Sequence, residues 1–568
     1  MTNYLLACEI GPIVDFISKS RKTTDLWGGS FLFSHIMRKA ANEIKINGGE
    51  IFIPFLPENF YETNDSGSIP DQIFAIVSEG KRPQIKAVLT TILPSVLEEI
   101  CRKIYVEKGI ETDFDPGQLT DYFYLFHIWH VIKGEKPSYD EYIVAEKKLK
   151  ARMLVHKFNQ LPQGNSVPKW NKCSLCGDRE GIYHRHEEAG KDEPANRENI
   201  CRVCLLKRFL MTYIEKTSQG YKPQKYQSTS DIALSPVKIF LEEKNNWKEI
   251  KEQIDDFKEN RNETDDNTDG RYFYDPEFQK KLSNVKEDLK TQFAESSEIK
   301  WFSRPFYSIV YMDGDNMGKF MSNVAERYPK EFSNVLNNIS ESIFDFSEGV
   351  RTIVEGHHGQ LIYAGGDDVI FMIHPEYLLQ CICRLVESYR GKLTSKASEA
   401  SLEQGLTKLL TISSGAVICP HKFPLSKAIS LSLEMLHDHA KKFRNDKNGI
   451  GICLIKGHTE SLRFTIPNEF LGALIELRTA LPSSAISMTA PHRLAEVKEF
   501  LEVIEDGGER RKYVETIIEK TRDGSRRPKT DTFLDKLMTI DSSGETSQAK
   551  TALTANTLLF LRFMSEDR

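Results

Sequence analysis

The sequence predicts an α+β protein built from two related sheet-and-helix domains, a small metal-binding domain between them and a helical domain after them. Three observations indicate this class. The order strand, turn, helix and two further strands occurs twice in the 568 residues. Two Cys-x-x-Cys pairs lie between the two copies, and amphipathic helical patterns follow the second copy. A chain of this length exceeds one hydrophobic core, so about three to five domains are expected.

Composition restricts the class of protein. Hydrophobic residues make up 40% of the chain and charged residues 28%, which is typical of a soluble globular protein. No apolar run approaches the roughly 20 residues that span a bilayer, and the start lacks the basic segment of a secretory signal. We therefore expect a cytoplasmic protein with no membrane partner. A net charge of −6 argues against broad nonspecific binding of nucleic acid, so any RNA contact is expected to be local.

The first predicted domain covers residues 1–164. "YLLACEIGPIVDFI" is typical of a buried strand, a glycine turn and the start of a helix. "INGGEIFIPFL" and "PDQIFAIV" predict two further strands, which a longer insert separates. A helical insertion completes this domain.

A zinc site is predicted in a small domain over residues 165–215. "CSLCG" and "CRVC" are separated by 24 residues, and two such pairs can place four thiolates tetrahedrally around one Zn²⁺. A closed four-thiolate site leaves no position for water, so the metal is expected to be structural. His184 and His186 in the intervening loop could replace a cysteine ligand, but solvated loop histidines are the favoured interpretation. A redox role lacks the expected βαβ context. The candidate zinc ligands are Cys173, Cys176, Cys201 and Cys204.

Two helical regions flank the second sheet domain. Residues 216–300 are highly charged and are predicted to form a solvated helical linker region. Residues 463–568 are predicted to form a C-terminal helical bundle, which ends in "ANTLLFLRFM". Such a bundle can support the preceding domain and offer a docking face to other subunits.

The second sheet domain, residues 301–462, carries a cluster of acids. "YSIVYM" is typical of a buried strand, and it ends at Asp313-Gly314-Asp315, before a helix that starts near Lys319. "LIYAGGDDVIFMI" predicts a hairpin whose tip holds Asp367 and Asp368. If the strand that ends at Asp313 pairs beside this hairpin, all of these carboxylates converge at one end of a sheet.

Clustered carboxylates predict a site for divalent cations, because they repel one another strongly unless a cation lies among them. Phosphoryl transfer by two Mg²⁺ or Mn²⁺ ions about 4 Å apart suits such a cluster: one ion activates the attacking hydroxyl and the other stabilises the leaving pyrophosphate. We expect Asp313 and Asp368 to be shared ligands. Asp367 and Asp315 would be further ligands or outer-shell groups, with Gly314 also at the metal site. The alternative is an ordinary polar hairpin turn.

Four more residues are candidates for binding the nucleotide. Gly365 and Gly366 lack side chains and so let a triphosphate approach the hairpin backbone. Lys441, near the end of a predicted helix, can reach a phosphate as a point charge, or else caps a solvated helix end. Lys319 is a weaker candidate of the same kind.

The first domain is interpreted as a copy of the second that has lost most of its acids. The alignment that matches Gly11 with Gly314 and Phe74 with Phe371 leaves one acid of the four, Asp71. It places the following residues opposite one another: Ile10 and Asp313, Pro12 and Asp315, Pro70 and Asp367, and Asp71 and Asp368. The first domain is therefore predicted to be degenerate and the second catalytic.

These motifs resemble a known family. "MDGDNMGKF", "YAGGDDVIF" and "SSGAVICP" are similar to the palm domains of GGDEF-type nucleotidyl cyclases. "IGPIVDFISKSRKTTDLWGGSFLFSHIM" resembles the first palm of the large subunit of type III CRISPR–Cas effector complexes, of the Cmr (III-B) kind. The resemblance covers nearly the whole chain and implies two ferredoxin-like palms.

The resemblance also implies an activity and partners. The chain would assemble with the other subunits of the complex and with CRISPR guide RNA, and a matching target RNA would activate the second palm. That palm would join ATP into cyclic oligoadenylates, second messengers for antiviral defence. Asp313, Asp367 and Asp368 match the metal-binding acids of the family. Ser30 in "DLWGGS" matches a serine near the acceptor nucleotide, although a helix cap or a buried hydroxyl is an equal alternative.

Two departures from the family matter. Many relatives begin with an HD nuclease domain, whereas the first palm here starts within ten residues of Met1, so no HD-type DNase is expected. "IPDQIF" stands where relatives carry a "PNRF"-like sequence. Asp71 makes this edge acidic, which would favour a cationic adenosine compound over a second ATP, as in family members that join AMP to S-adenosylmethionine. The alternative is that Asp71 caps a turn on the surface.

A hypothesis of another class stays open at this point. The chain could be a noncatalytic scaffold whose palms only bind nucleotide or neighbouring subunits. The intact acids of the second palm favour an enzyme, since a decayed site would be expected to lose them.

Overall fold

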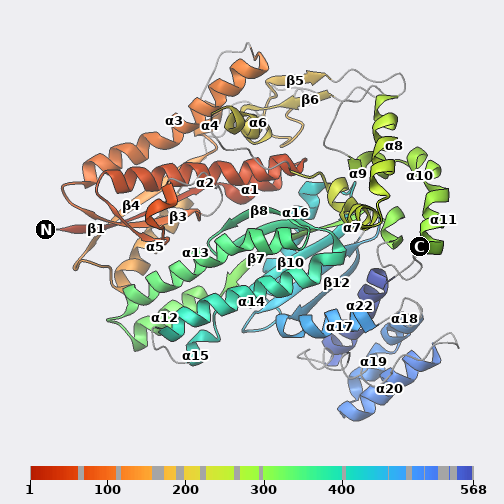
Figure 1. The fold of residues 1–568 in the computed structure, drawn as a ribbon. Coiled ribbons are helices and arrows are strands. Elements are labelled where there is room, and N and C mark those ends of the chain that lie inside the picture. Colours follow the sequence, from red (N-terminus) through yellow and green to blue (C-terminus); the bar gives the residue numbers. More distant parts are fainter. Residues whose placement is uncertain are drawn as a thin grey trace.

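Two β-sheets organise the part of the chain that the computed structural model describes (Figure 1). The α+β class predicted from the sequence is confirmed. The structure describes residues 2–61, 69–110, 117–155, 172–186, 197–217, 226–260, 269–292, 299–399, 404–457, 460–480, 489–504, 506–521, 537 and 547–565. None of the described helices is long and apolar enough to cross a membrane.

The first sheet has four antiparallel strands in the order β2 (Glu50–Ile53), β3 (Gln72–Ser78), β1 (Asn3–Gly11) and β4 (Tyr124–Ile132). The central strand β1 is buried on both faces, which explains its near-continuous apolar sequence. Helices α2 (Thr23–Ile46) and α3 (Arg82–Lys108) pack on one face, and α5 (Tyr139–Leu154) packs on the other.

The second sheet has six strands in the order β12 (Glu460–Pro467), β11 (Gly449–Ile455), β10 (Thr411–Pro420), β7 (Phe306–Asp315), β9 (Asp368–Ile373) and β8 (Gln360–Gly365). Only the β10–β11 pair is parallel. Helices α13 (Phe332–Gly356) and α14 (Pro375–Glu399) lie side by side on one face (Figure 1). Helix α16 (Leu425–Glu434) and the π-helical turn η5 (Met435–Ala440) pack on the other face.

Strand order and register agree with the internal repeat predicted from the sequence. In both sheets the first strand of the unit lies between the third and the fourth strand: β3-β1-β4 in one, β9-β7-β10 in the other. Ala7 pairs with Phe74, and Val310 pairs with Phe371. Because Gly11 and Gly314 each lie four residues beyond these paired positions, the registers match the alignment of Gly11 with Gly314 and of Phe74 with Phe371.

The two palms contact each other directly. Ser340 on α13 accepts a 2.7 Å hydrogen bond at Oγ from the backbone N–H of Phe55, which follows β2. The rings of Phe55 and Phe60 both pack against Phe344 on α13, with centroids 6.0 and 6.1 Å away. Helix α2 also packs against strand β8. The two sheets are therefore held at a fixed mutual position, and the ends of their strands can build one site.

The described part of residues 216–300 is helical as predicted, but it is not merely solvated. Ile254 and Phe257 on α8, and Tyr272 and Phe278 farther along, are buried in the same core as the second sheet. Charged residues occupy the other side of α8, so the composition concealed an apolar stripe at positions 250, 254 and 257. The helices of this region are α7 (Thr229–Glu243), α8 (Trp247–Glu259), α9 (Asp269–Phe273), α10 (Pro276–Lys281) and α11 (Ser283–Gln292).

The C-terminal region is helical after its first strand. Strand β12 crosses the boundary predicted between residues 462 and 463, because it pairs with β11 and so belongs to the second sheet. Lys300 donates a 2.6 Å hydrogen bond to the carbonyl of Met564, which ties the last helix to the second palm. The helices here are α17 (Leu471–Ala480), α18 (Thr489–Glu496), α19 (Lys498–Val503), α20 (Gly507–Lys520) and α22 (Ser547–Ser565).

The remaining elements are short, apart from one helix. Strands β5 (Tyr183–His186) and β6 (Arg197–Ile200) form a small hairpin, which helix α6 (Arg202–Thr217) follows. The other short elements are α1 (Ile13–Ser18), η1 (Glu58–Tyr61), α4 (Gly117–Thr120), η4 (Ile299–Ser303), α12 (Met317–Arg327), α15 (Gln404–Thr407) and η6 (Asn468–Phe470).

Candidate functional site

A cavity of about 260 Å³ lies between the two palms, where the acidic ends of β7 and β9 face helices α1 and α2. Its polar lining comes from both palms: Ser30, Ser34, Asp71, Asp313, Tyr363, Asp368 and His437. Most of the other lining residues are apolar, among them Ile13, Phe33, Met37, Ile69 and Leu436. A small acidic region beside an apolar wall suits a ligand with a charged part and a planar apolar part.

The pairing of β7 with β9 brings Asp313 and Asp368 together. The last pair in this register joins Met312 and Val369, so the next position places Asp313 opposite Asp368. Residues opposite one another on antiparallel strands have Cα atoms about 5 Å apart. The convergence predicted from the sequence therefore has its geometric basis in the sheet.

Asp367 lies against the same strand end. A β-carbon at Gly314 would stand less than 3.0 Å from Asp367 Oδ2 and 2.7 Å from the hydroxyl of Tyr389. Only glycine leaves room for this carboxylate, which explains the glycine between the two acids of β7.

The hairpin tip points at the first palm. Gly365 pairs with Asp368, so Gly366 and Asp367 form a two-residue turn. Gly366 has φ +66°, a backbone conformation that favours glycine. A β-carbon at Gly366 would stand 3.5 Å from Pro70 Cβ, so the two palms approach each other closely here.

Lys441 follows the π-helical turn η5 and reaches the acids from the face of the sheet on which η5 packs. Its ammonium donates to the carboxylate of Asp313 and, over 3.0 Å, to the carbonyl of Gly314. The preceding π-helical turn η5 lies very close to the sheet because Gly415 and Gly451, which pair with each other on β10 and β11, leave room for its backbone. A β-carbon at either glycine would collide with backbone carbonyls of this segment.

Asp315 has a different environment from the other acids. It is fully buried, and its Oδ2 accepts hydrogen bonds from Thr411 Oγ1 (3.0 Å), Ser413 Oγ (2.8 Å) and the backbone N–H of Asn448 (3.1 Å). Its Oδ1 has no partner among the described residues. Asp315 thus braces the strand end, and this arrangement favours the outer-shell role over direct metal ligation.

Burial and mutual repulsion perturb the acids strongly. Burial, followed by the charge of Asp313, raises the pKa of Asp367 from 3.8 to about 6. Desolvation in the cavity, followed by the charges of Asp367 and Asp313, raises the pKa of Asp368 well above its usual value, although part of its side chain remains exposed to solvent. Burial raises the pKa of Asp71 to about 6 as well. These carboxylates carry more negative charge than the single ammonium of Lys441 can offset.

The donor set fits Mg²⁺ or Mn²⁺, which prefer carboxylate and carbonyl oxygens. Asp313, Asp367 and Asp368 would hold such ions. The ammonium of Lys441, in contact with Asp313, shows that a cation is accommodated at this carboxylate. Among the described residues, however, these acids are not gathered as tightly as the cysteines, as expected for carboxylates that repel one another.

The first palm contributes three polar residues to the cavity, Ser30 and Ser34 on α2 and Asp71 before β3. Ser30 Oγ donates to the carbonyl of Leu26 over 3.1 Å, while Ser34 Oγ is buried with no partner among the described residues. Asp71 lines the cavity, and its charge raises the pKa of Asp368. This position in the cavity lining disfavours the alternative of a turn cap on the outer surface. Ser34 was missed from the sequence, although its spacing of one helical turn from Ser30 places both on one face of α2.

Two further residues differ from expectation. Lys319 is exposed on α12 and is not among the described residues that line the cavity. His437 was not singled out from the sequence, but it lines the cavity on η5. Burial lowers its pKa, against the opposing charge of Asp313. Its spacing of four residues from Lys441 is the signal that could have indicated a shared helix face.

The four predicted cysteine ligands form one cluster. Their sulfur atoms all lie within 4.8 Å of one another. Gly177, with φ +70°, donates its N–H to the carbonyl of Cys173 over 2.9 Å, which closes the first turn. Cys204 donates its N–H to Cys201 Sγ over 3.5 Å in the second. Four sulfur donors at this spacing fit a tetrahedral Zn²⁺.

Comparison with known proteins agrees with this arrangement. A family model described as Cas10/Cmr2, second palm domain, matches residues 306–451. A second model, described as CRISPR-associated protein Cmr2, N-terminal, matches residues 5–105. Residues 5–105 and 306–451 are therefore similar to two domains of Cas10/Cmr2 proteins. The two matched regions contain the strands and helices that line the cavity from each side.

The individual proteins that this chain resembles are distant from it in sequence. The CRISPR system Cmr subunit Cmr2 of Pyrococcus furiosus is 26% identical over 549 residues, which cover 80% of this chain and 61% of that protein. A cryo-EM structure of type III-B Cmr-beta in the apo state matches with a TM-score of 0.64 at 15% identity, covering 100% of this chain and 82% of that one. The target-RNA-bound Cmr-beta structure gives 0.63 at 14% identity, covering 95% and 83%. The fold is therefore shared.

Proposed function

We propose that this chain is a metal-dependent nucleotidyltransferase that acts within a type III-B CRISPR effector complex in the cytoplasm. In this proposal target RNA activates the second palm, which converts ATP into cyclic oligoadenylate, a second messenger for antiviral defence. The observation that carries the proposal is the convergence of Asp313, Asp367 and Asp368 at one strand end, where Asp313 and Asp368 line a cavity that both palms build. The complex, its guide RNA and its target RNA are suggested by the Cmr relatives.

The reaction is the attack of a ribose hydroxyl oxygen of one adenylate on the α-phosphorus of ATP. A new phosphodiester bond forms, the bond to the β-phosphate breaks, pyrophosphate leaves and the hydroxyl proton passes to solvent or a nearby base. Two divalent ions held by the acids would supply charge neutralisation for the nucleophile and for the leaving group.

The protein's own groups have separate tasks. The glycines at the hairpin tip, Gly365 and Gly366, let phosphates approach the backbone. Lys441 offers the positive charge nearest to Asp313 and would contact a phosphate once ions occupy the acids. The apolar lining of α1 and α2 gives a planar base a surface from which water is excluded.

One observation favours a different molecule as the acceptor of AMP. Asp71 adds negative charge to the first-palm side of the cavity and interacts with both acids of the hairpin tip. A triphosphate placed there would be repelled, whereas a sulfonium or ammonium group would be attracted. The alternative product is therefore AMP joined to S-adenosylmethionine. Partial neutralisation of Asp71, whose pKa is about 6, limits this preference.

One experiment separates the two products and the scaffold alternative. The assembled complex with guide RNA is incubated with labelled ATP, Mg²⁺ or Mn²⁺ and target RNA, with and without S-adenosylmethionine. Mass spectrometry then distinguishes cyclic oligoadenylates, an AMP conjugate and unreacted ATP. Release of pyrophosphate only with target RNA supports the enzyme. Nucleotide binding without product under every condition would establish a noncatalytic scaffold.

A further inference from the structure

We propose that the four-cysteine unit holds helix α1 in the position that completes the cavity, and that Lys207 is the positioning residue through which it acts. The ammonium of Lys207 contacts the carbonyls of Phe16 and Lys19 at the end of α1, so we expect it to influence ligand binding through α1. The inference rests on the proposed use of the cavity for a nucleotide.

Helix α1 needs support from outside because it is only six residues long. Short helices are unstable in isolation, and most of their stability comes from packing. Yet α1 supplies three lining residues of the cavity, Ile13, Val14 and Ile17. Val14 is 60% exposed, so the helix is packed on one side only. The contacts that fix the position of α1 therefore set the shape of this wall of the cavity.

Lys207 provides that support from α6. Its ammonium donates to the carbonyl of Phe16 over 2.7 Å and to the carbonyl of Lys19 over 3.0 Å, which are the free carbonyls at the end of α1. The side chain is 1% exposed, and its charge also lies 4.7 Å from the centre of the Phe16 ring. A cation at a helix C-terminus complements the helix dipole, and burial strengthens the interaction.

The same part of α6 is joined to the cysteines and to α2. Cys204 lies one helical turn before Lys207, in the first turn of α6. Arg208 forms a buried ion pair with Asp25 at the start of α2, with Nε 2.5 Å from Oδ1 and Nη2 3.1 Å from Oδ2. The carbonyl of Lys207 lies where a β-carbon of Gly28 would stand, so α6 and α2 are in backbone contact. The packing of α6 against α2 therefore fixes the position of Lys207.

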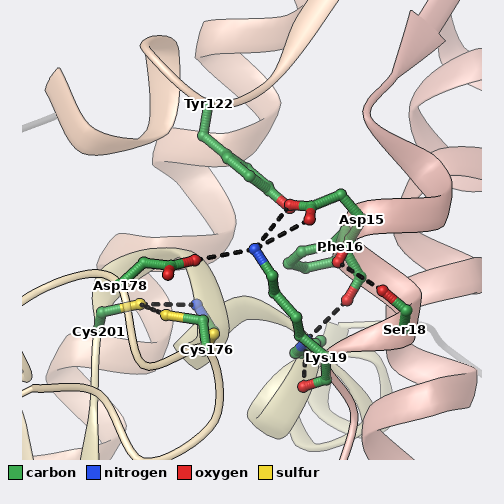
Figure 2. Close-up of polar contacts among 10 residues, drawn as sticks. Asp15, Phe16, Ser18, Lys19, Tyr122, Cys176, Asp178 and Cys201 are labelled. Atoms are coloured by element: carbon green, nitrogen blue, oxygen red, sulfur yellow. Dashed lines mark hydrogen bonds and ion pairs between the residues drawn. The ribbon is translucent and has the colours of Figure 1, made fainter. Parts of the chain in front are cut away.

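A second link runs from the loop between the cysteines. Lys19 donates to Asp178 over 2.8 Å and to Asp15 of α1 over 3.0 Å (Figure 2). Tyr122 donates its hydroxyl to Asp15 over 2.8 Å. Figure 2 shows Lys19 between α1 and the loop that carries Cys176 and Asp178. Asp178 lies two residues after Cys176, so a metal bound by the cysteines would hold this contact as well.

The test compares Lys207→Met with a matched buried lysine. Lys300 is 6% exposed and donates to the carbonyl of Met564 at the end of α22, away from the cavity. Binding of α,β-methylene-ATP with Mg²⁺ is measured together with the zinc content and with hydrogen exchange of residues 13–19. We expect Lys207→Met to keep its zinc, to weaken binding about tenfold and to speed exchange in α1 about tenfold. Lys207→Arg should restore most of the affinity, since a guanidinium also donates to two carbonyls.

Lys300→Met should lower the melting temperature without changing affinity or exchange in α1. Unchanged affinity and unchanged α1 exchange in Lys207→Met would overturn the inference. If Lys207→Met does not fold, Asp178→Asn tests the exposed link, with about two- to threefold faster exchange expected in α1. Wild-type-like exchange in that variant would likewise count against the inference.

Removal of zinc by a chelator should speed α1 exchange in the nucleotide-free protein. This readout is independent of the proposed activity. A wild-type protein that binds no nucleotide would refute the proposed function, whereas the exchange measurement would still decide whether the cysteine unit holds α1.

Discussion

The carboxylate of Asp367 lies against the α-carbon of Gly314, less than 3.0 Å from the point where a β-carbon would stand. This contact joins the hairpin tip between β8 and β9 to the end of β7. It keeps three carboxylates at one strand end even though their charges repel. The Asp-Gly-Asp and Gly-Gly-Asp-Asp motifs are thus parts of one packing arrangement.

Gly314→Ala should displace Asp367, because the added methyl group occupies the space of its Oδ2. We expect a loss of about 1–3 kcal/mol in the free energy of unfolding and at least about a tenfold loss of product formation. Gly318→Ala is the control, because a β-carbon there meets no atom within 4 Å. Urea unfolding and product assays of both variants measure the effect. Equal behaviour of the two variants would contradict the packing argument.

Lys441→Met removes the ammonium that contacts Asp313. The charge of Lys441 lowers the pKa values of Asp367 and Asp368, so its loss should raise both and weaken binding of the metal–nucleotide pair. We predict about a tenfold higher KM for ATP with a smaller change in kcat. Lys442→Met removes an exposed neighbour that pairs with Asp438 and should stay within about twofold of wild type. Steady-state kinetics of the complex decide between these outcomes.

Glu9 is expected to make the stability of the protein depend on pH. This effect does not involve the two acids of the hairpin tip, Asp367 and Asp368. Burial and then the charge of Asp71 raise its pKa from 4.5 to about 7, against a hydrogen bond from Gln72 Nε2. The folded state therefore binds the proton more tightly than the unfolded state does. This stabilisation is fully present below pH 4.5 and is lost as the pH rises through about 7.

Glu9→Gln keeps the shape and cannot ionise. We expect the variant to be about 1–2 kcal/mol more stable than wild type at pH 8 and nearly equal to it at pH 4.5. Urea unfolding at both pH values checks this. A stability difference that is the same at the two pH values would show that the charge of Glu9 is not the cause.

The cysteine cluster predicts one zinc per chain. Cys204→Ser should lose the metal to a mild chelator and unfold at a lower temperature, because metal binding contributes directly to folding. Cys383→Ser is the control: this half-buried thiol on α14 lies outside the cluster and contacts Glu387. Atomic absorption measures the zinc content. Full zinc retention by Cys204→Ser would exclude that residue as a ligand.

The sequence predicted the cluster of acids at the strand end. Side chains alternate between the two faces of a strand, so the register of two paired strands fixes which side chains meet. Once β7 pairs with the hairpin, Asp313 and Asp368 must lie opposite each other. The repeat alignment succeeded for the same reason: Gly11 and Gly314 hold equivalent places in two sheets of the same order. The four cysteines were also predictable, since tight turns bring closely spaced thiolates together.

Other features depend on long-range packing that no local pattern reveals. The contact of Lys441 with Asp313 requires two glycines on neighbouring strands, Gly415 and Gly451, and a π-helical turn above them. The charged region before the second palm was misinterpreted because a few buried aromatic side chains outweigh its average composition. Lys207 gave no signal in the sequence, since a buried lysine is indistinguishable there from an exposed one.

The most direct test of the metal-dependent transferase uses Asp367→Asn with Asp368→Asn in the assembled complex, supplied with ATP, Mg²⁺ and target RNA. Product is quantified by mass spectrometry, and assembly is checked by size-exclusion chromatography. We predict an intact complex with product reduced at least about a thousandfold, because the carboxylates that hold the divalent ions are gone. Synthesis at the wild-type rate by an intact variant complex would contradict the account.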